Sequence, residues 1–282
     1  MTDRPLSSLK VDLNDIILAY GDHRGHPPLR VEIAADGGIK PSQVLATAGA
    51  AGALFMIATT LLQPGDHLIV VRPNYATNLE TPRAIGCEIT LINLAFEEGF
   101  ALDLDQIANA IHPNTKLISL TTPHNPTGVC LDLATLQGAA ALAAKAGCHL
   151  LVDETYRDMV FKPKLPLAAT LGPHIISVSS VSKSYGIPGV RVGWIVNTDP
   201  SLMERLLAAK EQIGICGSML DKTAAAAAIA DRHTFLPELQ TRLAGGREIV
   251  AGWIAGEMRM EWVRPEGGCV CFPRIKASVA VD

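Results

Sequence analysis

The feature that most constrains the fold of this chain is a series of short apolar runs rich in β-branched residues. Each run is bounded by Pro, Gly, Asn or Asp. Continuous apolar runs of this length are typical of strands buried on both faces, as in a mostly parallel sheet. Six strands are predicted, at residues 67–71, 88–92, 116–121, 149–153, 174–179 and 192–196.

Helix-like segments separate these runs and are predicted at residues 50–62, 103–111 and 133–146. A chain that alternates strands and helices at this spacing builds a doubly wound domain with helices on both faces of its sheet. We therefore predict an α/β fold of three layers, α/β/α, around a mostly parallel sheet.

After Asp199 the pattern becomes helical, with helices predicted at residues 200–212, 222–231 and 236–258 and a last apolar strand at 269–272. This tail has the pattern of an incomplete small α+β domain. The predicted division is an N-terminal segment 1–24, a large ligand-binding domain 25–245 and a partial small C-terminal domain 246–282.

The composition excludes several classes of function. The 282 residues are 48% apolar and 18% charged, which suffices for a sizeable core and excludes a mainly disordered chain. The net charge is −4, and Lys and Arg form no run, which argues against nucleic acid or an anionic membrane as a partner. A small-molecule enzyme or a neutral binding protein remains.

The six cysteines form no Cys-x-x-Cys pair, and the chain opens with polar residues rather than a secretory signal. We expect reduced thiols in a cytoplasmic protein, without a disulfide framework or zinc. The uncharged stretch 41–65 is long enough to cross a bilayer. Its threonines and glycines and its closing Gln-Pro-Gly-Asp turn favour a buried helix instead.

Ligands of an open α/β sheet bind beyond the carboxyl ends of its strands, and the predicted strand ends of this chain carry unusual polar residues. A further segment of small residues opens the uncharged helix. The four segments are Thr122-Pro-His-Asn-Pro-Thr-Gly128, Asp153-Glu-Thr-Tyr156, Ser180-Val-Ser-Lys183 with the following Arg191, and Thr47-Ala-Gly-Ala-Ala51.

Two of these segments have the chemistry of a phosphate site. Free amides at the start of a helix suit an anion, and two hydroxyls with a forked guanidinium add the remaining donors. The candidate residues are Gly49, Ala50, Ala51, Ser180, Ser182 and Arg191.

The remaining polar residues specify which phosphate compound is bound. Lys183 beside the phosphate can become a Schiff-base nucleophile, and Asp153 can hold a ring nitrogen protonated. A phosphate, such a lysine and such an aspartate together specify pyridoxal 5′-phosphate (PLP). Each motif alone is usually an ordinary turn, but the ordered set at successive strand ends makes that reading improbable.

The sequence resembles the fold-type I PLP-dependent enzymes, specifically the class I/II aminotransferase family, from about Tyr20 to Phe272. The motifs that carry the resemblance are Tyr20…Gly25…Leu29-Arg30, Thr47-x-Gly-Ala, Pro64-Gly-Asp66, Pro73-x-Tyr75, Pro123-His-Asn-Pro-Thr-Gly128, Asp153-x-x-Tyr156 and Ser180-x-Ser-Lys183…Gly-x-Arg191-x-Gly193.

The resemblance implies a role for each matching residue. Lys183 corresponds to the lysine that forms the internal aldimine and then acts as the general base, and Asp153 to the partner of the pyridinium nitrogen. Asn125 and Tyr156 correspond to the pair that hydrogen-bonds the phenolic oxygen, and Tyr75 to the ring stacked on the cofactor. The implied catalytic set is Lys183, Asp153 and Tyr156, with the phosphate held by the six residues named above.

Tyr20 is similar to a tyrosine that reaches the phosphate of the partner subunit, which implies a homodimer with shared active sites. The implied reaction moves an amino group between an α-amino acid and a 2-oxo acid, as part of amino acid metabolism. The chain departs from the family pattern in two respects: the small-domain arginine that binds the substrate α-carboxylate has no counterpart, and few residues precede Tyr20. Two alternatives therefore stay open, another PLP-dependent reaction (β-lyase, cyclase or oxidase) and a truncated PLP-binding protein without turnover.

Overall fold

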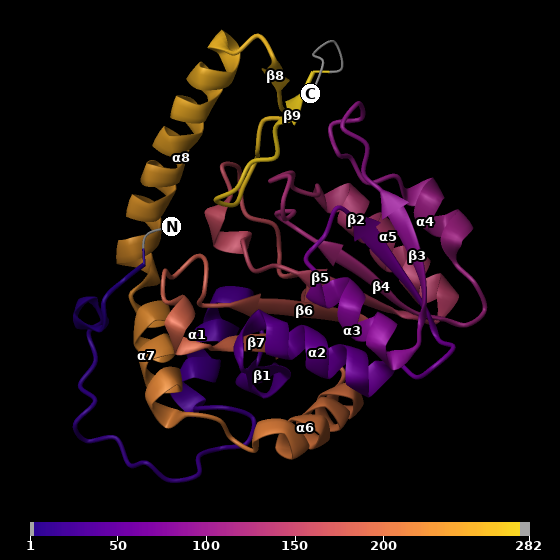
Figure 1. The fold of residues 1–282 in the computed structure, drawn as a ribbon. Helices are drawn as coiled ribbons and strands as arrows, with labels where there is room; N and C mark the ends of the chain where they lie inside the picture. Colours follow the sequence, from indigo (N-terminus) through magenta and orange to yellow (C-terminus); the bar gives the residue numbers. More distant parts are fainter. Residues whose placement is uncertain (1–2, 277–282) are drawn as a thin grey trace.

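A seven-stranded sheet forms the centre of the computed structural model, which describes residues 3–276 (Figure 1). The strand order is β1-β7-β6-β5-β4-β2-β3. Only β7 runs in the opposite direction to the other six strands. The predicted mostly parallel sheet is thus confirmed. Its strands are β1 (Val44–Thr47), β2 (His67–Arg72), β3 (Glu88–Asn93), β4 (Thr115–Thr121), β5 (His149–Asp153), β6 (Ile175–Ser180) and β7 (Gly193–Val196).

Helices cover both faces of this sheet, so the predicted three-layer α/β/α architecture is confirmed (Figure 1). The helices are α1 (Pro27–Gly37), α2 (Gly49–Leu61), α3 (Thr77–Ile85), α4 (Leu104–Ala110), α5 (Leu133–Ala146), α6 (Pro200–Gly214), α7 (Met219–Ala230) and α8 (Arg232–Gly256).

Successive side chains of a strand point to opposite faces of the sheet, and β2 shows the consequence. Leu68 and Val70 belong to one apolar cluster with residues of α2 and α6. Ile69 and Val71 belong to a second cluster with residues of α4 and α5. Because both faces are covered, the strand reads as an uninterrupted apolar run in the sequence.

The uncharged stretch 41–65 forms β1 and α2, and α2 buries Ala53, Leu54 and Ile57 in the core. The prediction of a buried helix in this stretch is confirmed. Within residues 3–276, no helix is both long and apolar enough to cross a membrane.

Among the strands and α-helices of residues 3–256, three were not predicted: β1, α1 and α3. β1 is only four residues long and lies in the same uncharged stretch as α2, so no change of pattern separates the two. The helices α1 and α3 were not predicted because both contain proline, which usually indicates a turn. α1 begins with Pro27 and Pro28, where a missing N–H costs nothing, and α3 contains Pro82 near its end.

The C-terminal region differs from prediction in its last strand. Residues 269–272 form no strand; instead, two short strands, β8 (Met260–Glu261) and β9 (Arg274–Ile275), pair antiparallel. The segment before the predicted strand is bonded to two loops: Gly267 N donates to Gly128 O (3.0 Å) and Gly268 N to Met159 O (2.9 Å). The predicted boundary at residue 245 falls inside α8, and the domain division stays a prediction.

Candidate active site

A cavity of about 200 Å³ opens where the carboxyl ends of β4, β5 and β6 meet. The register of the sheet brings these ends together, because Thr121 of β4 lies opposite Asp153 of β5, and Asp153 lies opposite Val178 of β6. The cavity is lined by Ala50, Ala51, Leu54, Tyr75, Thr121, Asn125, Asp153, Thr155, Tyr156, Ser180, Ser182, Lys183, Pro188 and Arg191.

One end of the cavity is the start of α2. The residue that precedes this helix is Ala48, whose methyl side chain cannot accept a hydrogen bond from the helix. The amides of the first turn are therefore available to an anion. Gly49 has φ +72°, and a Cβ on it would stand 2.6 Å from Nη2 of Arg191. Glycine is required here because it lets the guanidinium lie directly against the helix start.

Two serines complete this polar end. Nη1 of Arg191 donates to Oγ of Ser182 (3.3 Å) and to the carbonyl of Pro188 (2.9 Å). Ser180, the last residue of β6, is buried beside them. The arrangement of a guanidinium, two hydroxyls and helix amides matches the donor set of a phosphate.

Lys183 follows β6 in a turn and is half-buried at the cavity. Within residues 3–276 Lys183 forms no ion pair with a carboxylate. Arg191, Ser180 and Ser182 line the same cavity. A lysine that faces a cavity without a carboxylate partner keeps its amine available for chemistry.

Asp153 ends β5 and is 7% exposed. Its Oδ1 accepts a hydrogen bond from the Thr155 amide (3.0 Å), and burial raises the pKa of the carboxyl above its ordinary value. A buried carboxylate without a cationic partner is unfavourable. A protonated ring nitrogen in the cavity would supply the missing positive charge, so this residue fits a pyridinium.

The remaining predicted residues stand around the same space. Tyr156 is buried, and burial, with the nearby Cys269 and Asp153, raises the pKa of its phenol, which therefore stays protonated as a donor. Asn125 is half-buried, and Tyr75 is 46% exposed at the mouth. Two predicted residues are not part of the lining: Gly49, which lies under Arg191, and Tyr20, which is 81% exposed in the N-terminal segment.

Sequence reasoning missed two polar residues of the lining. Thr121 and Thr155 are each 7% exposed, and the Oγ1 atom of each is buried without a hydrogen-bond partner. Buried hydroxyls are normally paired, so both point to a group that occupies the cavity. Their signal in the sequence is position: Thr121 is the last residue of a strand, and Thr155 follows Asp153 by two residues.

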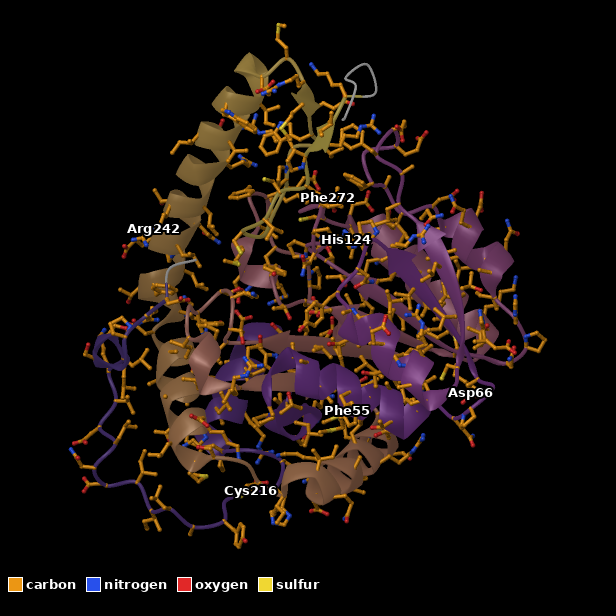
Figure 2. The ribbon with its side chains drawn as sticks, in the orientation of Figure 1. Phe55, Asp66, His124, Cys216, Arg242 and Phe272 are labelled. Atoms are coloured by element: carbon orange, nitrogen blue, oxygen red, sulfur yellow. The ribbon has the colours of Figure 1, made fainter. Side chains whose placement is uncertain are left out.

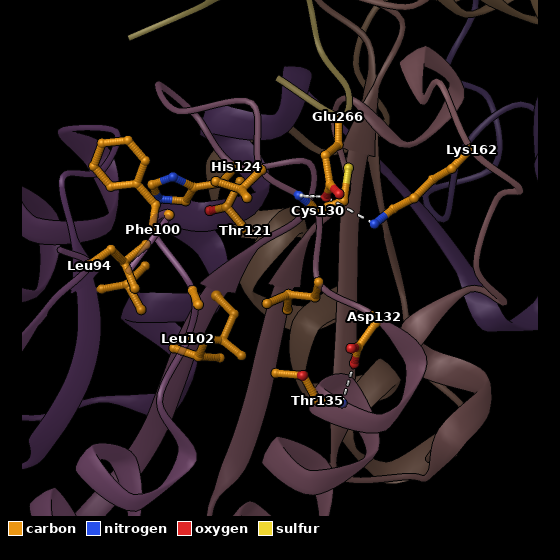
Figure 3. Close-up of a pocket in the computed structure, with 16 residues that line it drawn as sticks. Leu94, Phe100, Leu102, Thr121, His124, Cys130, Asp132, Thr135, Lys162 and Glu266 are labelled. Carbon is orange, nitrogen blue, oxygen red and sulfur yellow. Dashed lines mark hydrogen bonds and ion pairs between the residues drawn. The ribbon is translucent and has the colours of Figure 1, made fainter. Parts of the chain in front are cut away.

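A second cavity, of about 270 Å³, shares Thr121 with the first (Figure 3). Its charged groups are already bonded within the protein, because Glu266 pairs with Lys162 (2.9 Å) and Asp132 accepts from the Thr135 amide (2.7 Å). Burial lowers the pKa of His124 in its wall to about 4, so this imidazole is neutral at pH 7. The first cavity, with its unpaired lysine and aspartate, is therefore the candidate active site.

Comparisons with known proteins agree with this geometry. The family model "Aminotransferase class I and II" matches residues 8–282. The arginine–pyruvate transaminase of Pseudomonas aeruginosa is 30% identical over 264 residues, which cover 88% of this chain and 65% of the relative. The capreomycidine synthase of Streptomyces vinaceus is 30% identical over 275 residues, which cover 96% of this chain and 70% of the relative.

A solved structure is similar as well. The PLP-dependent aminotransferase of Streptococcus suis superposes with a TM-score of 0.89 at 30% identity, covering 95% of this chain and 71% of that one. This chain spans less than two thirds of the length of the arginine–pyruvate transaminase that it matches. The family match over residues 8–282 and the likeness to these relatives lead to one conclusion: the chain belongs to the class I and II aminotransferase family.

Proposed function

We propose that this protein is a PLP-dependent aminotransferase that moves an amino group between an α-amino acid and a 2-oxo acid. The observation that carries the proposal is the single cavity around Lys183, which is lined by every predicted cofactor residue except Gly49 and Tyr20. When bound, PLP supplies an electron sink for the pair left at the substrate α-carbon. The protein supplies binding, orientation and proton transfer.

The polar end of the cavity binds the phosphate. The amides of Ala50 and Ala51 and the hydroxyls of Ser180 and Ser182 donate to it, and Arg191 adds a positive charge. These donors are fixed by the sheet and by α2, so they hold the cofactor in one orientation without rearrangement.

The other residues act on the ring and on the substrate. Asp153 would keep the ring nitrogen protonated, because a cationic ring and the buried carboxylate would stabilise each other. Tyr156 and Asn125 line the cavity as hydrogen-bond donors that would hold the phenolic oxygen, and Tyr75 at the mouth would offer an aromatic face to the ring. The amine of Lys183 would act as the general base, taking the proton from the substrate α-carbon and holding it for return to the cofactor-substrate pair.

We further propose a homodimer in which Tyr20 reaches the active site of the partner. The N-terminal segment around this residue exposes Ile17 (80%), Leu18 (75%) and Tyr20 itself (81%). Large apolar side chains exposed in succession are typical of an interface. Light scattering of the purified protein tests the oligomeric state, and a Tyr20→Ala variant tests whether this residue adds to cofactor affinity.

All six cysteines are free thiols, which supports a proposed location in the reducing cytoplasm. Cell fractionation tests this location directly.

The central experiment is titration of the purified protein with PLP. The wild type should gain the visible absorbance of a lysine-bound cofactor, and borohydride should fix the cofactor covalently to the chain. Lys183→Ala should lose both signals, whereas Lys145→Ala, which removes an exposed lysine of α5, should keep them. An unchanged spectrum in Lys183→Ala would overturn the assignment.

A second stage separates the reaction types. Amino acids are screened for conversion of the loaded cofactor to the pyridoxamine form, and a 2-oxo acid is then added to regenerate it. Regeneration supports transamination. Ammonia, an eliminated group or a cyclised product without regeneration supports another PLP reaction, and a spectrum that no amino acid changes supports binding without turnover.

A further inference from the structure

Two buried lysines lie outside the lining of the active-site cavity. Lys210 on α6 is 6% exposed and Lys222 on α7 is 5% exposed. Both line a separate cavity of about 190 Å³, whose wall also includes Arg191 and Cys216. Figure 2 shows Cys216 between the end of α6 and the start of α7.

Each lysine has only a backbone carbonyl as its polar partner. Nζ of Lys210 donates to the carbonyl of His23, and Nζ of Lys222 donates to the carbonyl of Gly217 (3.3 Å). An ammonium group has three N–H donors, so most of their donors are unused within the described residues. In residues 3–276 neither lysine forms an ion pair, and the nearby Asp22 already pairs with Arg30 (2.5 Å).

Burying two like charges without an anion is costly. Burial, together with the charge of Lys222, lowers the pKa of Lys210 to about 8, and burial also lowers the pKa of Lys222. At neutral pH Lys210 is therefore still mostly charged. The cavity holds an excess of positive charge, because Asp221 at the start of α7 is its only carboxylate among the described residues.

The rest of the wall is mainly apolar and small. Met56, Ile213 and Val192 contribute hydrocarbon surface. A volume of about 190 Å³ admits a small anion with a short apolar body but excludes a nucleotide or a peptide.

We propose that this cavity is an oxyanion-binding site that holds a small carboxylate or inorganic phosphate between Lys210 and Lys222. It is distinct from the phosphate end of the active site, which is lined by Ser180, Ser182 and Lys183. The two donor sets share only Arg191. The anion completes the charge balance of the α6–α7 junction and stabilises the fold there.

The test uses protein saturated with PLP, so that the active-site phosphate position is filled. Sodium phosphate, sodium acetate or sodium chloride is added at constant ionic strength, and melting temperature and titration calorimetry are recorded. Phosphate or acetate should bind saturably and raise the melting temperature by roughly 5 °C at a large excess over Kd. The phosphate and acetate arms identify the source of the oxyanion. Equal, non-saturable effects of all three salts would show an adventitious ionic effect and overturn the proposal.

Matched variants assign the effect to the lysines. Lys222→Met removes one charge while keeping an unbranched chain and should weaken anion binding at least tenfold, whereas Lys222→Arg keeps the charge and should retain binding. Lys145→Met makes the same charge change on the exposed face of α5 and should behave as the wild type. Undiminished binding in Lys222→Met would also overturn the proposal.

A measurement on the wild type alone covers the case in which Lys222→Met does not fold. Acetate affinity should fall several-fold between pH 7 and pH 9, as Lys210 loses its proton. A constant affinity would contradict the role of Lys210. The charged and titratable groups around Lys210 come from three places. They are Asp22, His26 and Arg30 at and before the start of α1, Cys216, Asp221 and Lys222 of the α6–α7 region, and Arg191. Loss of PLP absorbance reports failure of the proposed function separately, since it does not depend on these lysines.

Discussion

Gly193 at the start of β7 lies so close to Gly49 that a Cβ on Gly193 would stand 2.4 Å from the carbonyl carbon of Gly49. The neighbouring amide nitrogen of Ala50 would be 2.6 Å away. β7 therefore supports the start of α2 through direct backbone contact, and the phosphate donors depend on a residue without a side chain.

Gly193→Ala is predicted to push the start of α2 away from the sheet, because overpacking costs about 1–3 kcal/mol. PLP affinity should fall roughly tenfold or more, measured by titration of the visible absorbance. Gly189→Ala is the matched control, since nothing lies within 4 Å of its Cβ position. Equal affinities of the two variants would contradict the contact.

Asp153→Asn is predicted to separate stability from activity. Burial raises the pKa of this carboxyl, so in the ligand-free protein its ionisation weakens the fold as pH rises above the ordinary range of an aspartate. The ligand-free variant should melt at a higher temperature than the wild type at pH 7. Amino group transfer should fall at least about 100-fold.

The measurements for Asp153→Asn are calorimetric melting without cofactor and single-turnover kinetics with it. Asp105→Asn, on the exposed surface of α4, should change neither. A lower melting temperature for the ligand-free Asp153→Asn protein would show that the carboxylate is stabilised by a group other than the cofactor.

Glu154 is predicted to make the free energy of unfolding depend on pH. Burial raises the pKa of Glu154 from 4.5 to about 7. Because the folded protein holds this proton more tightly than the unfolded chain, stability is greatest below the unfolded pKa and falls as pH rises through about 7. One pKa unit corresponds to about 1.4 kcal/mol, so the loss is roughly 3 kcal/mol.

Denaturant unfolding between pH 4 and pH 9 measures this dependence. Glu154→Gln should flatten the curve, whereas Glu238→Gln, whose side chain is 72% exposed on α8, should leave its shape unchanged. Parallel curves for the wild type and Glu154→Gln would refute the prediction.

Two buried threonines are predicted to respond oppositely to replacement by valine. The Thr155 hydroxyl has no partner, so Thr155→Val should stabilise the ligand-free protein by about 1 kcal/mol and weaken PLP binding. The Thr127 hydroxyl bonds to Nδ1 of His124 (2.8 Å), so Thr127→Val should destabilise the protein by about 1–3 kcal/mol. Melting curves with and without PLP test both; destabilisation of the ligand-free protein by Thr155→Val would show that its hydroxyl has a partner there.

Most strands of the sheet were predictable because they are buried on both faces. β1 is equally buried but was missed, because its four residues merge with the uncharged run of α2. β2, β4 and β5 read as apolar runs because helices cover both sides. The same rule failed at residues 269–272, since an apolar run forms a strand only where a partner strand is available. There the preceding Gly267 and Gly268 bond to loops instead.

The site was largely predictable because parallel strands end at one edge of the sheet. Asp153 and Lys183 therefore meet in one cavity although thirty positions separate them in the chain. Thr155 and Lys222 could not be predicted in the same way. The position of Thr155 just after a strand end marks it as a candidate for the lining, but whether a hydroxyl is unpaired or an ammonium is buried depends on what surrounds it in three dimensions.

The bonds from residues 267 and 268 to the segments that follow β4 and β5 have a consequence for the site. Gly267 is bonded to Gly128, in the loop that carries Asn125, and Gly268 is bonded to Met159, just beyond Tyr156. The segment that follows α8 is therefore bonded to both stretches that carry the groups expected to touch the cofactor oxygen. One C-terminal segment thus joins two stretches of the chain that are otherwise thirty-one positions apart, at residues 128 and 159.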